Sequence, residues 1–210
     1  MTRKVLNKRK VFYFISLLTM SLLLFITGLK LYSDFHNKNK QPENIKKQVD
    51  SIELYGYTLS DNATDLYKEY FNELKTVLNT SPLDEKKYSE IVVKAFVTDF
   101  YTLDNKITST DIGGTEFIHP DLVDNFMMNA GDTIYDSVES NLYNERTQDL
   151  PVVSNVTVNN VEETEYTYND NKYKGYKIEC SWEYESDMGY DKSATFVVVK
   201  VDSKYYIVEN

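Results

Sequence analysis

The feature that most constrains this chain is an uncharged run of 19 residues, 11–29, near its start. At about 1.5 Å per helical residue the run would span roughly 28 Å, close to the ~30 Å hydrocarbon core of a bilayer. Twelve of its residues are Val, Leu, Ile or Phe, which favour insertion into lipid. Tyr13 and Tyr32 lie near its two ends, where amphipathic rings prefer the interface. The run therefore predicts a transmembrane helix over residues 11–32 that contacts the lipid bilayer.

The charges around this run indicate its orientation. Residues 1–10 carry five basic side chains and no acidic one, whereas the whole chain has 23 basic and 33 acidic side chains and a net charge of −10. The positive-inside rule then predicts a cytoplasmic basic tip, residues 1–10, and an extracytoplasmic remainder. A cleaved signal peptide is the alternative, but the apolar run is longer than such a peptide needs and no small-x-small cleavage site follows it. We therefore expect a single-pass protein of the cell membrane.

The composition excludes several classes of function. One Cys and two His are too few for an internal disulfide, a cysteine-based zinc site or most histidine-built metal sites. The acidic balance argues against nucleic-acid binding, which needs a basic face. Gly113-Gly114 has no Gly-Lys-Ser/Thr partner, so it indicates a turn rather than a nucleotide-binding loop. We expect no cofactor, no metal and no nucleic-acid partner.

The segment after the anchor predicts a polar linker followed by one folded domain. Residues 33–53 are polar and mixed in charge, which is typical of a stalk, partly helical at most. The domain is expected to occupy residues 54–210. Apolar residues recur there at helical spacing, with Ser81 and Pro82 as the expected start of the second helix. The three helical stretches are 61–79, 82–103 and 120–143.

The period changes to two after Pro151, which predicts β-strands. Alternation over residues 176–184 is typical of a half-buried antiparallel strand. Further strands are expected over 152–168 and 195–208, the latter divided by a turn at Asp202-Ser203. The chain therefore predicts an α+β domain of about three helices packed on a curved antiparallel sheet of about four strands.

This order of elements resembles the cone-shaped nuclear-transport-factor-like fold. The stretches FVTDFYTLDNK and DIGGTEFIHPDLVDNF, within residues 96–126, are similar to uncharacterised single-pass membrane proteins of low-GC Gram-positive bacteria. A basic tip, one anchor and an outer cone domain also resemble the scaffold proteins of type IV secretion and conjugation machines. The resemblance implies a cone filled by the second helix, with Ile178, Trp182 and Val197 facing that helix. It implies no catalytic motif, because one fold serves many functions.

Few side chains suggest chemistry. An enzyme on this fold would need an acid such as Asp99 aimed into a pocket with a tyrosine such as Tyr101, yet the helical pattern places Asp99 on the polar face or over the neighbouring loop. Cys180 belongs to the apolar set of its strand, which predicts a buried and inert thiol. His119 precedes Pro120 and is expected to cap a helix or lie at the surface. Two acidic pairs are expected to be solvated: Asp121 with Asp124, and Asp132 with Asp136.

The 18 tyrosines suggest an interaction surface. Exposed tyrosine is favoured at protein interfaces, although β-strands also use tyrosine for packing alone. The candidate interaction residues are Tyr166, Tyr168, Tyr173, Tyr190 and Tyr206.

These features predict a non-enzymatic, membrane-anchored extracytoplasmic scaffold or assembly protein of a bacterial cell-envelope complex, such as one for conjugation or type IV secretion. Its partners would be other envelope proteins, and a homo-oligomer is compatible with the same role. Two alternatives stay open. One is a ligand-binding or sensing domain that uses the cone pocket, and the other is an isomerase-like or hydrolase-like enzyme on the same fold.

Overall fold

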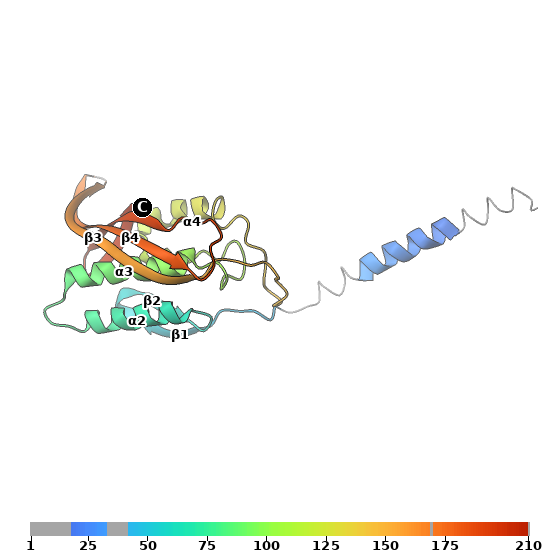
Figure 1. The fold of residues 1–210 in the computed structure, drawn as a ribbon, viewed down its shortest axis with the longest axis horizontal. Helices are drawn as coiled ribbons and strands as arrows, with labels where there is room; N and C mark the ends of the chain where they lie inside the picture. The colour runs from blue at the N-terminus through green and yellow to red at the C-terminus, as the bar shows by residue number, and fades with distance from the viewer. Residues whose placement is uncertain (1–17, 33–41, 169, 210) are drawn as a thin grey trace, which may run out of the picture. The chain divides into compact units, whose positions relative to one another are not determined.

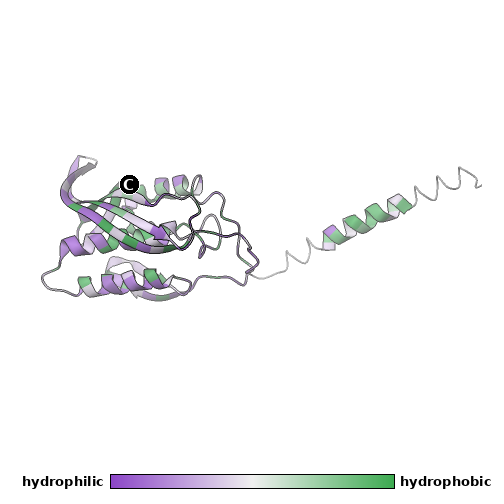
Figure 2. Ribbon diagram, in the orientation of Figure 1, coloured by the Kyte–Doolittle hydropathy of each residue, from purple (hydrophilic) through white to green (hydrophobic). Residues whose placement is uncertain are grey.

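The computed structural model describes residues 18–32, 42–168 and 170–209, in two compact units, Met1–Pro42 and Glu43–Asn210. In the first unit, residues 18–32 form a helix that is apolar along most of its length (Figure 2). The Thr27 hydroxyl donates to the carbonyls of Leu23 and Leu24, both at 3.0 Å. None of the helices in the described parts of the chain is long and apolar enough to cross a membrane. Residues 11–17 of the expected anchor lie outside the described residues.

The second unit is an α+β domain with a four-stranded antiparallel sheet and a separate two-stranded sheet. The predicted α+β class and the predicted four-stranded sheet are therefore confirmed. Helix α3 lies between α2 and the sheet (Figure 1). The elements are β1 (Gln48–Ile52), η1 (Glu53–Tyr55), β2 (Tyr57–Ser60), α2 (Asp65–Leu78), α3 (Glu85–Tyr101), η2 (Thr115–Phe117), η3 (Pro120–Leu122), α4 (Val123–Gly131), β3 (Val153–Tyr168), β4 (Asn171–Tyr184), β5 (Ser193–Val201) and β6 (Lys204–Glu209).

The linker expected over residues 33–53 is shorter, because residues 48–52 form β1 and pair antiparallel with β2. Ile52 lies opposite Tyr57, whose ring is fully buried. The sequence of β1, QVDSI, has no clear alternation, so its partner rather than its own pattern makes it a strand. The folded unit therefore begins before residue 54.

Side-chain caps set where the two long helices begin. The Thr64 hydroxyl accepts from the N–H of Tyr67 at the start of α2. Asp84, not Ser81, caps α3 by accepting from the N–H of Lys87 at 2.9 Å. The expectation that the helix would begin at residue 82 was therefore wrong, since the side chain that caps it lies three residues after Ser81 and α3 begins at Glu85.

Only the first part of the stretch 120–143 is helical. His119 caps η3 by accepting from the N–H of Asp121 at 3.3 Å, which was one of the two roles expected for it. Helix α4 follows and ends at Gly131. Residues 133–143, expected to be helical, form turns instead. Tyr135 explains the change: its buried hydroxyl donates to the carbonyl of Phe100 at 2.7 Å and accepts from the N–H of Gly113 at 3.0 Å.

The sheet has the strand order β3-β4-β5-β6, antiparallel throughout. Trp182 and Ile178 are buried, as expected, but Val197 does not share their face. It lies opposite Lys177, whereas Phe196 lies opposite Ile178. The inward-facing set of β5 is therefore offset by one residue from the prediction.

Aromatic side chains fill the space between α3 and the sheet. The ring of Phe96 on α3 lies 5.5 Å from that of Phe196, 5.3 Å from that of Phe100 and 5.9 Å from that of Phe126, between centroids. Trp182 is 2% exposed and its ring lies 4.5 Å from that of Tyr101. Burial of such rings supplies most of the stabilisation of a core.

The β3–β4 hairpin extends beyond the rest of the sheet. Pairing between β4 and β5 stops at Gly175 opposite Val199, whereas β3 and β4 stay paired as far as Tyr168 opposite Asn171. We call residues 162–168 and 170–174 the hairpin arm, which curls away from the sheet in Figure 1. Among the described residues, the arm pairs with no third strand, so its outer edges are open to pairing with another strand.

Candidate functional site

Three of the five candidate tyrosines surround one histidine. The ring of His119 lies 5.8 Å from that of Tyr206, 6.0 Å from that of Tyr168 and 6.3 Å from that of Tyr173. Two of these tyrosines come from the hairpin arm and one from β6. His119 itself is only 8% exposed. The four residues, which we call the His119 cluster, therefore hold the arm against the loop that precedes η3.

The other two candidates also have aromatic or strand partners. Tyr166 lies opposite Tyr173 in the arm, and the ring of Tyr190 lies 6.2 Å from that of Tyr184. All five candidates are half-buried rather than exposed. Their rings thus shape the arm and its surroundings, and only their outer surfaces can meet a partner.

Lys204 joins this aromatic region from the start of β6. Its ammonium lies 4.3 Å from the ring centroid of Tyr57 and 4.9 Å from that of Tyr206. Burial lowers the pKa of Lys204 to about 8.

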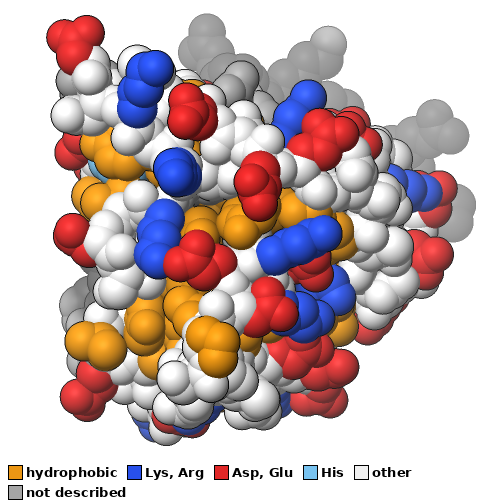
Figure 3. Space-filling model, turned by 90° about the vertical axis from the view of Figure 1, so that its left-hand side faces the viewer, with side chains coloured by type: hydrophobic (Ala, Val, Ile, Leu, Met, Phe, Trp, Pro, Cys, Tyr) orange, Lys and Arg blue, Asp and Glu red, His pale blue; other side chains and the backbone are white. Residues whose placement is uncertain are grey.

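On the end face that carries the hairpin tip, apolar side chains lie in a band among acidic and basic ones (Figure 3).

Asp99 is a partner of a buried lysine. Its Oδ1 accepts from the ammonium of Lys106 at 2.7 Å, and its Oδ2 accepts from the N–H of Gly114 at 2.6 Å. Burial alone would raise the pKa of Asp99, but the Lys106 ammonium and the Gly114 N–H leave this pKa below its usual value. Asp99 therefore anchors the loop after α3, whereas Tyr101 packs on Trp182 and does not meet it.

Glu116 is the centre of a second polar group. Its carboxylate accepts from the N–H and the hydroxyl of Thr58, the latter at 2.8 Å, and from the hydroxyl of Tyr67 at 2.9 Å. Burial raises the pKa of Glu116 in spite of these hydrogen bonds. A cavity of about 120 Å³ separates this group from Asp99, and the buried Oδ1 of Asn105, on its wall, has no hydrogen-bond partner among the described residues.

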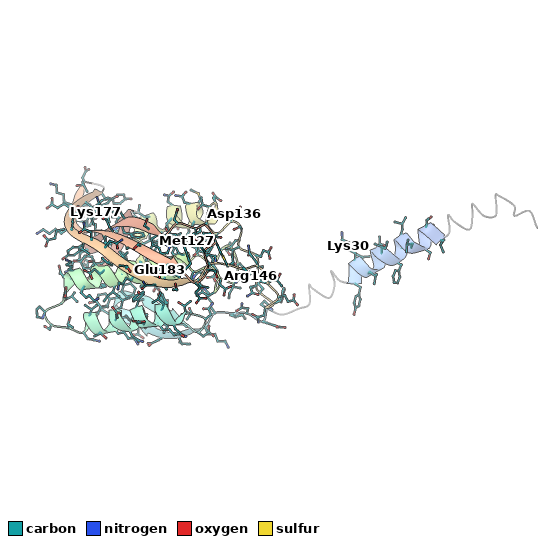
Figure 4. All side chains as sticks on the ribbon, in the orientation of Figure 1. Lys30, Met127, Asp136, Arg146, Lys177 and Glu183 are labelled. Atoms are coloured by element: carbon teal, nitrogen blue, oxygen red, sulfur yellow. The ribbon has the colours of Figure 1, made fainter. Side chains whose placement is uncertain are left out.

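A larger cavity lies beside α4. It has a volume of about 450 Å³ and is bounded by α4, the end of α3 and β6. Figure 4 labels Met127, which belongs to α4, and Asp136, in the turns that follow this helix. We call this larger cavity the α4 cavity. It is lined by Phe100, Tyr101, Ile118, Leu122, Asn125, Phe126, Asn129, Ala130, Thr133, Ile134, Asp191, Ile207 and Val208.

Cys180 and the acidic pairs take the places that their patterns predict. Cys180 is 1% exposed, and burial raises the pKa of its thiol to about 12. Asp121, Asp124, Asp132 and Asp136 are all exposed. Within residues 18–32, 42–168 and 170–209, no three His, Cys, Asp or Glu side chains gather into a metal site.

Sequence reasoning did not find the ion pair of Asp99 with Lys106, the Glu116 network or the α4 cavity. Asp99 lies near the end of α3 and Lys106 in the following loop, which Arg146 holds through the carbonyls of Asp104 and Lys106. The local sequence offers no signal for them, because Lys106 is flanked by Asp104 and Asp111 and nothing in the pattern shows that Asp99 is its partner.

No family model matches the chain, and no curated protein or solved structure is similar to it.

Proposed function

We propose that the chain is a membrane-anchored extracytoplasmic assembly protein of a bacterial cell-envelope complex, of the kind that serves conjugation or type IV secretion. The basic residues 1–10, the uncharged run 11–29 and the acidic remainder support a single-pass anchor with the N-terminus in the cytoplasm. Helices beside a curved antiparallel sheet support the cone-like fold.

The hairpin arm is the observation that carries the assembly role. Both of its edges offer backbone N–H and C=O groups to another strand, which is a common means of peptide and protein recognition. Tyr166, Tyr168 and Tyr173 give the arm aromatic surface. Its charges are mixed, because acidic side chains of β3 lie opposite lysines of β4, as Glu165 does opposite Lys174.

An enzymatic role has less support. The acid that it would require, Asp99, is bonded to Lys106 and Gly114, and Tyr101 packs on Trp182 instead of facing that acid. The ligand-binding alternative is favoured by one observation, the α4 cavity.

Cysteine accessibility in whole cells tests the orientation. Cys180 is buried and is the only native cysteine, so an added thiol has a low background. We expect Glu165→Cys, on the arm, to react with a membrane-impermeant maleimide from outside the cell, and Thr2→Cys to react only after lysis. Labelling in the reverse order would refute the proposed topology.

Site-specific photo-crosslinking in the membrane of the producing cell tests the assembly role. We expect a photoreactive residue at Glu163, on the arm, to give discrete protein adducts, and one at Lys68, on the exposed side of α2, to give none. Removal of residues 1–32 should abolish the arm adducts, because the domain would no longer be held beside its partners. Equal adducts from both positions, or none from Glu163, would count against this role.

A further inference from the structure

We infer that the α4 cavity binds a small apolar amine. Its volume of about 450 Å³ falls within the range of small-molecule sites, ~300–1,000 Å³. The floor is apolar and preformed: Phe100 and Ile118 are each 6% exposed and Ile207 is 2% exposed. Such a floor gains from contact with an apolar body, since the contact removes apolar surface of both from water.

Aromatic rings form one wall of the cavity. The ring of Phe100 lies 4.8 Å from that of Tyr101 and 5.1 Å from that of Phe126. The planes of these rings are inclined to one another by 83° and 45°, and all three residues line the cavity. An ammonium group beside aromatic faces is attracted by their negative π-clouds, which favours a cation over an anion.

Five of the thirteen residues that line the cavity have polar side chains, and four of these, Asn125, Asn129, Thr133 and Asp191, are exposed at its rim. Asn125 and Asn129 are one turn apart on α4 and are both exposed, so their amides flank the opening. The Tyr101 hydroxyl makes no hydrogen bond with the residues that the structure describes, which leaves an oxygen free to accept from a ligand. A ligand with one hydrogen-bonding head and an apolar body suits this distribution.

The charged residues that line the cavity indicate the charge of the ligand's polar group. Asp191 is the only charged side chain among the described residues that line the cavity, and no Lys, Arg or His is there to receive a carboxylate or phosphate. The chain as a whole has a net charge of −10, which repels anions further. A protonated amine therefore fits better than a fatty acid of the same length, and this conclusion goes beyond the assembly role.

Binding of three six-carbon probes to the full chain in non-ionic detergent tests the inference. The probes are n-hexylamine, n-hexanol and n-hexanoate, followed by saturation-transfer NMR and by the fluorescence of Trp182, whose ring contacts Tyr101. We expect n-hexylamine to bind most tightly and n-hexanoate least. Because partition into detergent is the same for every protein variant, only differences between variants count as binding to the cavity.

Three variants locate the site. Thr133→Trp and Asn125→Trp each place an indole at the exposed rim and should abolish binding of all three probes. Asp191→Asn should raise the dissociation constant of n-hexylamine by about two- to fivefold, which corresponds to the loss of an exposed ion pair. It should leave the dissociation constant of n-hexanol unchanged. Asp136→Asn, an exposed acid that does not line the cavity, is the matched control and should change nothing. Equal binding of hexanoate and hexylamine, or full binding in both tryptophan variants, would overturn the inference.

Discussion

The ammonium of Lys106 is completely buried and donates to the carboxylate of Asp99 at 2.7 Å, whereas the Asp99 side chain keeps 26% of its surface exposed. The pair therefore has one partner that cannot return to water without unfolding the loop after α3. Burial lowers the pKa of Lys106. The nearby Asp99 carboxylate raises this pKa and so offsets part of the lowering.

The first prediction concerns this pair. Asp99→Ala should lower the free energy of unfolding by about 3–5 kcal/mol, because it leaves a buried cation unpaired. The double variant Asp99→Ala with Lys106→Met should recover much of the loss. Urea unfolding of each variant measures both effects. Asp65→Ala removes a surface pair with Lys68 and serves as the control with little change expected. An Asp99→Ala protein as stable as the control would contradict the prediction.

The second prediction concerns pH. Glu116 is the only carboxyl group of the described residues whose pKa is raised, and burial is the main cause. The folded state holds its proton more tightly than the unfolded state, so the contribution of Glu116 to stability is fully present below the unfolded pKa of about 4.5 and is lost as the pH rises through the folded pKa.

Glu116→Gln, which cannot ionise, should therefore gain stability relative to the wild type as the pH rises from about 4.5 toward neutrality. Urea unfolding across this range measures the difference between the two proteins. The same measurement on Glu165→Gln, on the exposed arm, controls for the loss of one carboxylate. A constant difference for Glu116→Gln would show that its burial has no effect on ionisation.

A third prediction compares two glycines. Gly114 and Gly189 both have a positive φ, +73° and +80°, so alanine is strained at either position. A Cβ at Gly114 would also lie 2.7 Å from the Phe96 ring, whereas one at Gly189 meets nothing within 4 Å. Gly114→Ala should therefore lower the melting temperature more than Gly189→Ala, by the equivalent of about 1–3 kcal/mol of overpacking. Equal shifts would mean that the Phe96 ring moves aside freely.

The fourth prediction concerns Trp182, which is the only tryptophan and is 2% exposed. Its fluorescence maximum should be blue-shifted in the folded protein and move to the solvent-like value in urea. Trp182→Ala should cost roughly 3–5 kcal/mol, because the cavity it leaves adjoins the rigid ring of Tyr101. A solvent-like maximum before urea is added would refute the register of β4.

The sheet was largely predictable from the sequence, and the loops were not. Alternation over residues 176–184 and the turn at Asp202-Ser203 depend on local pattern, so both are found in the structure. Strand β1 was missed because its pairing with β2, not its own sequence, makes it a strand. The helix expected over residues 133–143 fails because hydrogen bonds of Tyr135 with Phe100 and Gly113 outweigh a weak helical spacing.

The candidate site was less predictable than the fold. The tyrosines were identified by residue type, but their convergence on His119 needs the arm, β6 and the loop before η3 in their final places. The same is true of the α4 cavity, whose wall comes from α3, α4 and β6. Residue type indicates which side chains could belong to a site. Which of them lie together depends on how distant elements pack.

The end of β4–β5 pairing at Gly175 separates two kinds of β-structure in one hairpin. Up to that residue, β4 is paired on both sides, with β3 and with β5, and α3 packs against the hairpin. Beyond it, every added pair of residues bonds only within the hairpin. The backbone of the arm is thus tied only to itself, and the rings of Tyr168 and Tyr173 beside His119 are what attach the arm to the rest of the domain.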